Sequence, residues 1–111
     1  MTTEFEPWEV VEAFVPFEDI SGKKKRPVVV LSETEAIVFS LKMTSHEPRY
    51  KTLEGEYELM HWQEAGLVKP TVVQCRKRLQ LGKDAFTGRK FGKLTLTDIL
   101  GLQYMIKYMK L

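Results

Sequence analysis

Residues 26–44 read Arg-Pro-Val-Val-Val-Leu-Ser-Glu-Thr-Glu-Ala-Ile-Val-Phe-Ser-Leu-Lys-Met-Thr and hold the two clearest β-strand signals of the chain. Residues 26–32 form a short, continuous apolar run, which is typical of a buried strand. In residues 36–44 apolar and polar side chains alternate, which predicts a strand with one face toward the core. The side chains expected on the apolar face are Ile37, Phe39, Leu41 and Met43, and those expected on the other face are Ser40, Lys42 and Thr44.

Two more long strands are predicted on either side of this pair. Residues 8–17 are rich in β-branched and aromatic side chains and are followed by the turn-forming residues 19–22. Residues 71–81 alternate as well, except that Lys77 falls on the apolar side. We therefore expect a β-bulge at Lys77 or an early departure of this strand from the core.

The rest of the chain adds a short strand and a terminal helix. Residues 57–59 are predicted to return as a strand, and residues 61–66 indicate a single helical turn that stops at its glycine. A helix is predicted from about Thr95, because Thr95 and Asp98 form a capping-box-like pair before an apolar stripe. The expected fold is mainly β: a small barrel of strongly bent antiparallel strands with a C-terminal α-helix. The sequence contains no repeat or linker, so residues 1–111 are expected to form a single domain.

The composition is that of an ordinary folded domain. Of the 111 residues, 43% are hydrophobic and 29% are charged, which argues against a disordered chain. Cys75 is the only cysteine, so an internal disulfide is excluded, and a lone thiol suits a reducing compartment. No apolar run approaches the roughly 20 residues needed to span a bilayer, and the first residues are acidic, unlike a signal peptide. We therefore expect a cytoplasmic protein that does not enter the membrane.

The net charge of +2 conceals a strong asymmetry along the chain. Residues 1–20 contain six acidic residues and no basic one, whereas the rest of the chain holds all 17 basic residues. Residues 69–93 alone carry eight basic side chains and a single acidic one, Asp84. A local excess of this size is typical of a surface that binds a polyanion such as nucleic acid. The alternative is a solvated surface with scattered lysines.

Four segments carry a further signal in a fixed order between residues 10 and 100. Residues 16–32 run from Pro-Phe-Glu-Asp through a lysine-rich stretch to Arg-Pro-Val-Val-Val-Leu-Ser, and residues 42–46 read Lys-Met-Thr-Ser-His. Residues 61–73 begin His-Trp-Gln-Glu-Ala-Gly-Leu, and residues 91–95 read Phe-Gly-Lys-Leu-Thr. Each segment is short, but in this order they resemble the MazF/PemK-like family of small bacterial toxins.

The resemblance implies an SH3-like barrel and a homodimeric toxin of a type II toxin–antitoxin system. Such a toxin is an endoribonuclease (an mRNA interferase) that cleaves single-stranded RNA without a metal or other cofactor, and a mostly disordered antitoxin neutralises it. Carried over by position, Arg26 and Thr44 correspond to the residues associated with the reacting phosphate. The chain differs from the family where many members carry an acidic residue before this arginine. It also differs at residues 76–78, which are all basic, so the general acid and base stay unassigned.

Metal-free RNA cleavage uses the 2′-hydroxyl as an internal nucleophile, so the protein must supply a base, an acid and donors for the charge on phosphorus. Arg26 offers planar donors directly before a buried strand; the alternative is a surface arginine at a strand end. Thr44 and Ser45 are candidate hydroxyl donors to phosphate, or else serve ordinary turn chemistry. His46 is a candidate for proton transfer, because histidine titrates near neutral pH, or else a bystander.

Seven basic residues are predicted to contact RNA phosphates: Lys23, Lys24, Lys25, Arg76, Lys77, Arg78 and Lys83. Arg76 and Arg78 share one face of the predicted strand, a spacing that suits successive phosphates. The alternatives are a solubilising loop at residues 23–25 and a solvated face on the strand. Two functions from different classes therefore remain open. One is a metal-independent endoribonuclease, and the other is a barrel that binds nucleic acid or a protein partner without cleaving.

Overall fold

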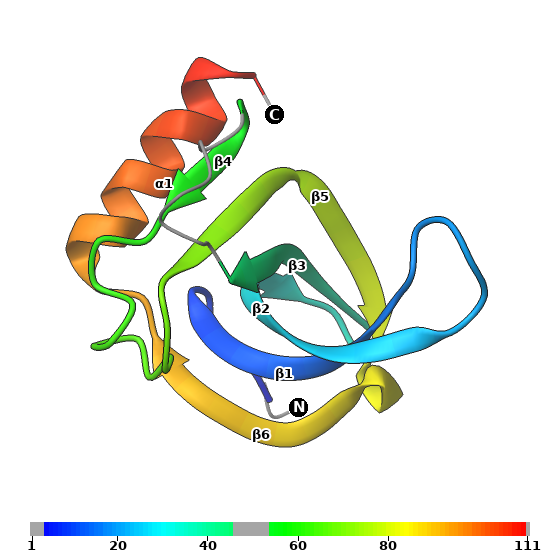
Figure 1. The fold of residues 1–111 in the computed structure, drawn as a ribbon. Helices are drawn as coiled ribbons and strands as arrows, with labels where there is room; N and C mark the ends of the chain where they lie inside the picture. Colours follow the sequence, from blue (N-terminus) through cyan, green and yellow to red (C-terminus); the bar gives the residue numbers. More distant parts are fainter. Residues whose placement is uncertain (1–3, 46–53, 111) are drawn as a thin grey trace.

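A six-stranded antiparallel sheet and one helix make up the fold (Figure 1). The computed structural model describes residues 4–45 and 54–110. In chain order the elements are β1 (Glu9–Pro16), β2 (Lys23–Glu33), β3 (Ile37–Ser45), β4 (Glu56–Glu58), β5 (Thr71–Gly82), a 3-10 turn (Lys83–Ala85), β6 (Phe86–Lys93) and α1 (Leu96–Tyr108). The predicted mainly β class with a C-terminal helix is confirmed. Within the described ranges, no helix has the length and apolar character needed to cross a membrane.

The strands are hydrogen-bonded in the order β4-β5-β3-β2-β1-β6. β4 and β6 are thus the two edges, and in the part of the chain that the structure describes they do not pair with each other. The sheet is strongly bent but not closed, so the predicted barrel is wrong in this respect. β4 holds only three residues and pairs with β5, so it offers too little strand to reach the far edge.

The valines of β2 lie between two clusters of buried side chains. Val29 belongs to a cluster that includes Leu102 of α1. Val28 and Val30 belong to a second cluster, together with Val38 of β3. Successive side chains of a strand point to opposite faces, so β2 is buried on both sides, as its continuous apolar run predicts.

A β-bulge in β5 bends the sheet where the sequence predicts one. Leu41 of β3 lies opposite Arg78, whereas the next residue, Lys42, lies opposite Gln74. Residues 75–77 are therefore extra in β5, and they include the lysine that interrupts the apolar pattern. Because a bulge lets a strand change direction, β5 passes here from the first cluster, which includes Cys75, to the second, which includes Leu81, and residues 76–78 between them are exposed.

The predicted facing of β3 is wrong in its first half. Ser40 is buried together with Val38, whereas Ile37 and Phe39 are only partly buried. The phase of burial changes after Ser40, because β3 passes the bulge of β5 there and crosses from the second cluster to the first. The predicted strict alternation of buried and exposed side chains over residues 36–44 fails because β3 contributes side chains to two clusters.

The single cysteine is part of the core. Cys75 is fully buried, and its thiol sulfur lies 3.8 Å from the sulfur of Met105 on α1. Burial raises the pKa of the Cys75 thiol to about 11. The thiol therefore stays protonated at neutral pH, where it packs as a small apolar group.

α1 begins where the capping signal predicts. Thr95 is the N-cap, and its hydroxyl accepts a hydrogen bond from the backbone N–H of Asp98 at 3.4 Å. The Asp98 carboxylate is turned the other way, so the capping box is only half formed. It is fully buried and accepts hydrogen bonds from the Tyr57 hydroxyl and from the backbone N–H groups of Met60 and His61, each at 2.9 Å. Asp98 therefore fastens β4 and the following loop to the first turn of the helix.

The sequence does not predict β6. Its residues, Phe-Thr-Gly-Arg-Lys-Phe-Gly-Lys, include two glycines, and none of them is fully buried. β6 pairs with β1 through two register shifts, and ion pairs such as Lys90–Glu9 at 3.2 Å join the two strands. Pairing with β1 holds this edge strand in place, because its own side-chain pattern has no apolar face.

Candidate nucleic-acid interface

The start of β2 and the end of β3 meet at a groove. Val28 lies opposite Lys42, so the antiparallel register brings Arg26 toward Thr44. Both residues line a groove of about 320 Å³, and Ser45 at the end of β3 lines it as well. Arg26 and Thr44 are half-buried. The structure thus gathers the two residues matched to the reacting phosphate, and the second hydroxyl candidate, at one place.

A loop and β6 form the opposite wall of the groove. The predicted helical turn at residues 61–66 is present and ends at Gly66, whose φ of +88° favours glycine. The backbones of this loop and of β6 touch: a Cβ on Gly66 would overlap the carbonyl oxygen of Phe91, and one on Gly92 would overlap that of Ala65. This close approach positions the wall residues Leu67, Val68, Lys69, Arg89 and Phe91.

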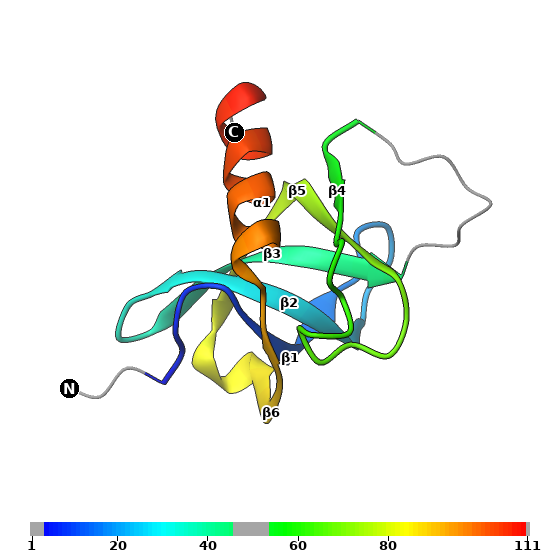
Figure 2. The same cartoon turned by 90° about the vertical axis from the view of Figure 1, so that its left-hand side faces the viewer.

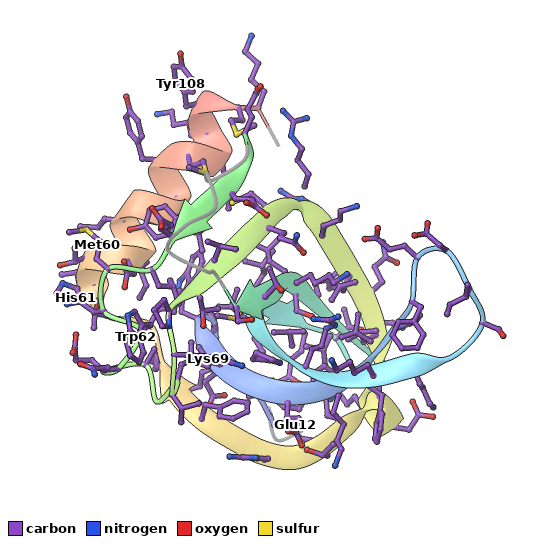
Figure 3. The ribbon with its side chains drawn as sticks, in the orientation of Figure 1. Glu12, Met60, His61, Trp62, Lys69 and Tyr108 are labelled. Carbon is purple, nitrogen blue, oxygen red and sulfur yellow. The ribbon has the colours of Figure 1, made fainter. Side chains whose placement is uncertain are left out.

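Positive charge dominates the groove. Its basic residues are Lys24, Lys25, Arg26, Lys69 and Arg89, and none of the described residues that line it is acidic. Arg89 lies over the Phe91 ring at 4.7 Å and 3.8 Å from the carboxylate of Glu12. Figure 3 shows Glu12 beside β1 and Lys69 near the loop that leads into β5. Within residues 4–45 and 54–110, the other four cations have no ion-pair partner, so the groove can attract a polyanion.

The three lysines that open β2 divide between two places. Lys24 and Lys25 line the groove, but they belong to a strand, so the predicted loop at residues 23–25 is wrong. Lys23 instead lies over the Phe14 ring at 5.3 Å. His46, the candidate for proton transfer, falls outside the described residues. In the described ranges no group of His, Cys, Asp and Glu side chains gathers in a way that could hold a metal ion.

The other predicted RNA contacts lie outside the groove. Arg76 and Lys77 are exposed in the bulge of β5, Arg78 is exposed directly after it, and Lys83 begins the 3-10 turn. Three of these four side chains already have acidic partners, so this surface is less positive than its sequence suggests. The ion pairs are Arg76–Glu54 at 3.3 Å, Lys77–Glu18 at 2.9 Å and Lys83–Glu33 at 3.1 Å.

Sequence reasoning does not single out Lys69, Arg89 and Phe91 as groove residues. The available signal is the basic excess of residues 69–93, which contains all three. No local spacing connects them with Arg26, because the contact depends on the loop-to-β6 approach and on the pairing of β6 with β1. The groove is therefore a product of tertiary structure.

Comparisons with known proteins agree with this architecture. Residues 6–109 match the family described as PemK-like, MazF-like toxin of type II toxin–antitoxin system. Among solved structures, an endoribonuclease in complex with its cognate antitoxin from a mycobacterial species has a similar fold, with a TM-score of 0.68 and 14% sequence identity. The alignment covers 95% of this chain and 94% of that chain. No curated protein sequence matches the chain.

Proposed function

Since the chain belongs to the family of PemK-like, MazF-like toxins of type II toxin–antitoxin systems, we propose that it is a toxin-type endoribonuclease that cleaves single-stranded RNA in the groove. The observation that carries this proposal is the meeting of Arg26, Thr44 and Ser45 in one cationic groove. Cleavage of RNA needs donors aimed at one phosphate and positive charge for the neighbouring phosphates. The groove offers both.

In the proposed reaction the 2′-hydroxyl oxygen attacks the adjacent phosphorus, and the 5′-oxygen of the next nucleotide leaves. The products are a 2′,3′-cyclic phosphate and a 5′-hydroxyl. Arg26 donates hydrogen bonds to the non-bridging oxygens as their negative charge grows, and the hydroxyls of Thr44 and Ser45 add neutral donors. His46, which directly follows Ser45 in the sequence, is the candidate for the proton transfers, because histidine can both accept and return a proton near neutral pH.

Incubating the purified chain with a long unstructured RNA in EDTA tests the proposal. Cleavage is expected to persist, because the substrate supplies the nucleophile and the protein supplies the donors. The same sequence as DNA should remain intact, since it lacks the 2′-hydroxyl. RNA that is bound but never cut would establish the alternative function, a barrel that binds nucleic acid without cleaving it.

We expect RNA affinity to depend more on the groove than on the exposed face of β5. Replacing Lys24, Lys25 and Lys69 together with Gln should weaken binding and lower the slope of log K against log salt by about 0.7 for each phosphate that the variant no longer neutralises. Replacing Arg76, Arg78 and Lys83 with Gln is the matched control, since it removes the same number of charges, and it should have the smaller effect because Arg76 and Lys83 are already paired with Glu54 and Glu33. Equal or reversed effects, measured by fluorescence anisotropy across a salt series, would place the main RNA surface on β5.

We also propose a homodimer that forms through the outer face of α1. Its exposed apolar side chains recur at every fourth position, which places them on one side of the helix. They are Leu96, Leu100, Tyr104 and Tyr108, with exposed fractions of 70%, 56%, 72% and 78%. Figure 2 shows that the C-terminal half of α1 rises beyond the sheet, and Tyr108 points away from the sheet in Figure 3. A contiguous apolar stripe of this kind is typical of an interaction surface.

Light scattering at micromolar concentration is expected to give twice the chain mass for the wild type. Changing both Tyr104 and Tyr108 to Ser should give a monomer, because it removes the stacked pair of the stripe (ring centroids 6.3 Å apart). Gln103→Ser, an exposed change on a neighbouring face of α1, is the control and should leave the mass unchanged. A monomeric wild type would contradict the proposal.

A toxin of a type II system is neutralised by an antitoxin, so we propose a cognate antitoxin as the protein partner and the cytoplasm as the location. The similar solved structure was determined with its own cognate antitoxin. A mostly disordered, acidic antitoxin segment would suit the groove for the same reason that RNA does, because both would present negative charge to the groove's cations.

A further inference from the structure

One acidic side chain sits between two lysines next to the groove. A single carboxylate oxygen of Glu18, Oε1, lies 2.9 Å from the Lys77 ammonium and 3.5 Å from that of Lys42. Lys42 belongs to the central strand β3, and only 16% of its side chain is exposed. A lysine so far from solvent needs an anion nearby, because desolvation penalises an unpaired charge.

This arrangement lies on the other side of Arg26 from the groove. Glu18 and Lys42 line a second hollow of about 360 Å³, and Arg26 lines this hollow as well as the groove. The cations of the two hollows therefore form one continuous series with Arg26 in the middle. An RNA backbone whose reacting phosphate is at Arg26 would have a neighbouring phosphate within reach of Lys42 and Lys77.

The carboxylate that occupies this place comes from a turn, so it can leave without breaking the sheet. Glu18 lies between β1 and β2, where the backbone N–H of Phe17 donates to the Gly22 carbonyl at 3.0 Å. About half of the Glu18 side chain is exposed. The hydrogen bond from Lys77 and the charge of Lys42 hold the pKa of Glu18 below its usual value, so Glu18 is ionised at neutral pH.

We propose that Lys42 and Lys77 form a second phosphate-binding subsite beside Arg26, and that Glu18 occupies it as an internal substitute for phosphate until RNA displaces it. The inference rests on the proposed function and names the residues that hold the phosphate next to the reacting one. In this proposal Lys77 binds a phosphate together with Lys42, and not as one of several exposed cations on β5.

The variant Glu18→Gln distinguishes two roles for Glu18: occupying a phosphate subsite, or only stabilising the turn at residues 17–22. If Glu18 only holds the turn at residues 17–22, removing its charge loosens the turn and leaves binding unchanged or weaker. If it blocks a phosphate subsite, removing its charge strengthens binding. The probe is a labelled single-stranded DNA oligonucleotide, because it carries the phosphates but lacks the 2′-hydroxyl and stays intact during the measurement.

In fluorescence anisotropy, Glu18→Gln should bind this oligonucleotide about three- to tenfold more tightly than the wild type, the range expected when two partly exposed ion pairs no longer compete. Glu35→Gln is the matched control. It removes the same charge from an exposed turn at the opposite end of β2 and β3, and it should change affinity less than about twofold. Adding Lys77→Gln or Lys42→Met to Glu18→Gln should cancel the gain, because the freed subsite is then destroyed.

RNA cleavage by the wild type, assayed in parallel, keeps the two proposals apart. If the wild type does not cut RNA but Glu18→Gln gains affinity for DNA, the endoribonuclease fails and the subsite stands. If RNA is cut but Glu18→Gln binds DNA no more tightly than the wild type, the subsite is wrong and Glu18 only stabilises the turn. Absence of binding by both proteins would also overturn the subsite.

Discussion

Arg26→Ala is expected to slow RNA cleavage about 100- to 1,000-fold, the usual cost of removing one donor to a charged transition state. The effect should appear in the single-turnover rate and far less in the dissociation constant for uncut RNA. A donor aimed at charge that develops during the reaction adds little to ground-state binding. Three other groove cations, Lys24, Lys25 and Lys69, would still hold the flanking phosphates.

Three further variants sharpen this result. Arg26→Lys should restore little activity, because a point charge cannot reproduce two parallel donors. Thr44→Ala should cost less than Arg26→Ala, since a neutral hydrogen bond is weaker than a charge-assisted one. Arg89→Ala is the matched control: it removes an arginine from the opposite wall of the same groove, and it should weaken binding more than chemistry. Cleavage by Arg26→Ala at the wild-type rate would show that the reacting phosphate binds elsewhere.

Asp98→Ala is expected to lower the free energy of unfolding by about 3 kcal/mol. The substitution leaves the Tyr57 hydroxyl and two backbone N–H groups without their acceptor, and each hydrogen bond removed from a buried charged group costs about 1.5–3 kcal/mol before relaxation. The carboxylate also lies in the first turn of α1, where the helix dipole favours negative charge. Burial raises the pKa of Tyr57 to about 12, and the hydrogen bond to Asp98 contributes to the shift.

Urea unfolding followed by circular dichroism measures this effect. Asp84→Ala removes an exposed carboxylate from the 3-10 turn and should change stability by no more than about 0.5 kcal/mol. Tyr57→Phe removes one of the three donors and should cost about 1.5 kcal/mol, the lower end of that range. An Asp98→Ala midpoint close to that of the wild type would contradict the prediction. It would mean that water hydrogen-bonds the three donors and that Asp98 does not hold β4 to α1.

Sequence patterns suffice for elements whose surroundings are uniform along their length. Both faces of β2 are buried at its three valines, so the strand appears in the sequence as a continuous apolar run. Thr95 caps α1 through a contact that spans only three residues. Lys77 indicates the bulge because a charge in an apolar register requires a departure from regular pairing.

The parts that escape prediction depend on long-range contacts. β6 has no apolar face of its own and becomes a strand because β1 pairs with it. Ser40 is buried because β3 changes clusters beside a bulge in another strand. Asp98 looks like half of a capping box, and its true partners lie in β4 and the following loop. The groove likewise joins Arg26 with Lys69 and Arg89, which no local spacing relates.

The position of β2 between two clusters has a mechanical consequence. Val29 packs in one cluster and Val28 and Val30 in the other, so a displacement of β2 would disturb both clusters at once. Arg26 belongs to this strand. Glu18 belongs to a turn that neither cluster includes. We therefore expect RNA binding to rearrange the turn at Glu18 more readily than the position of Arg26.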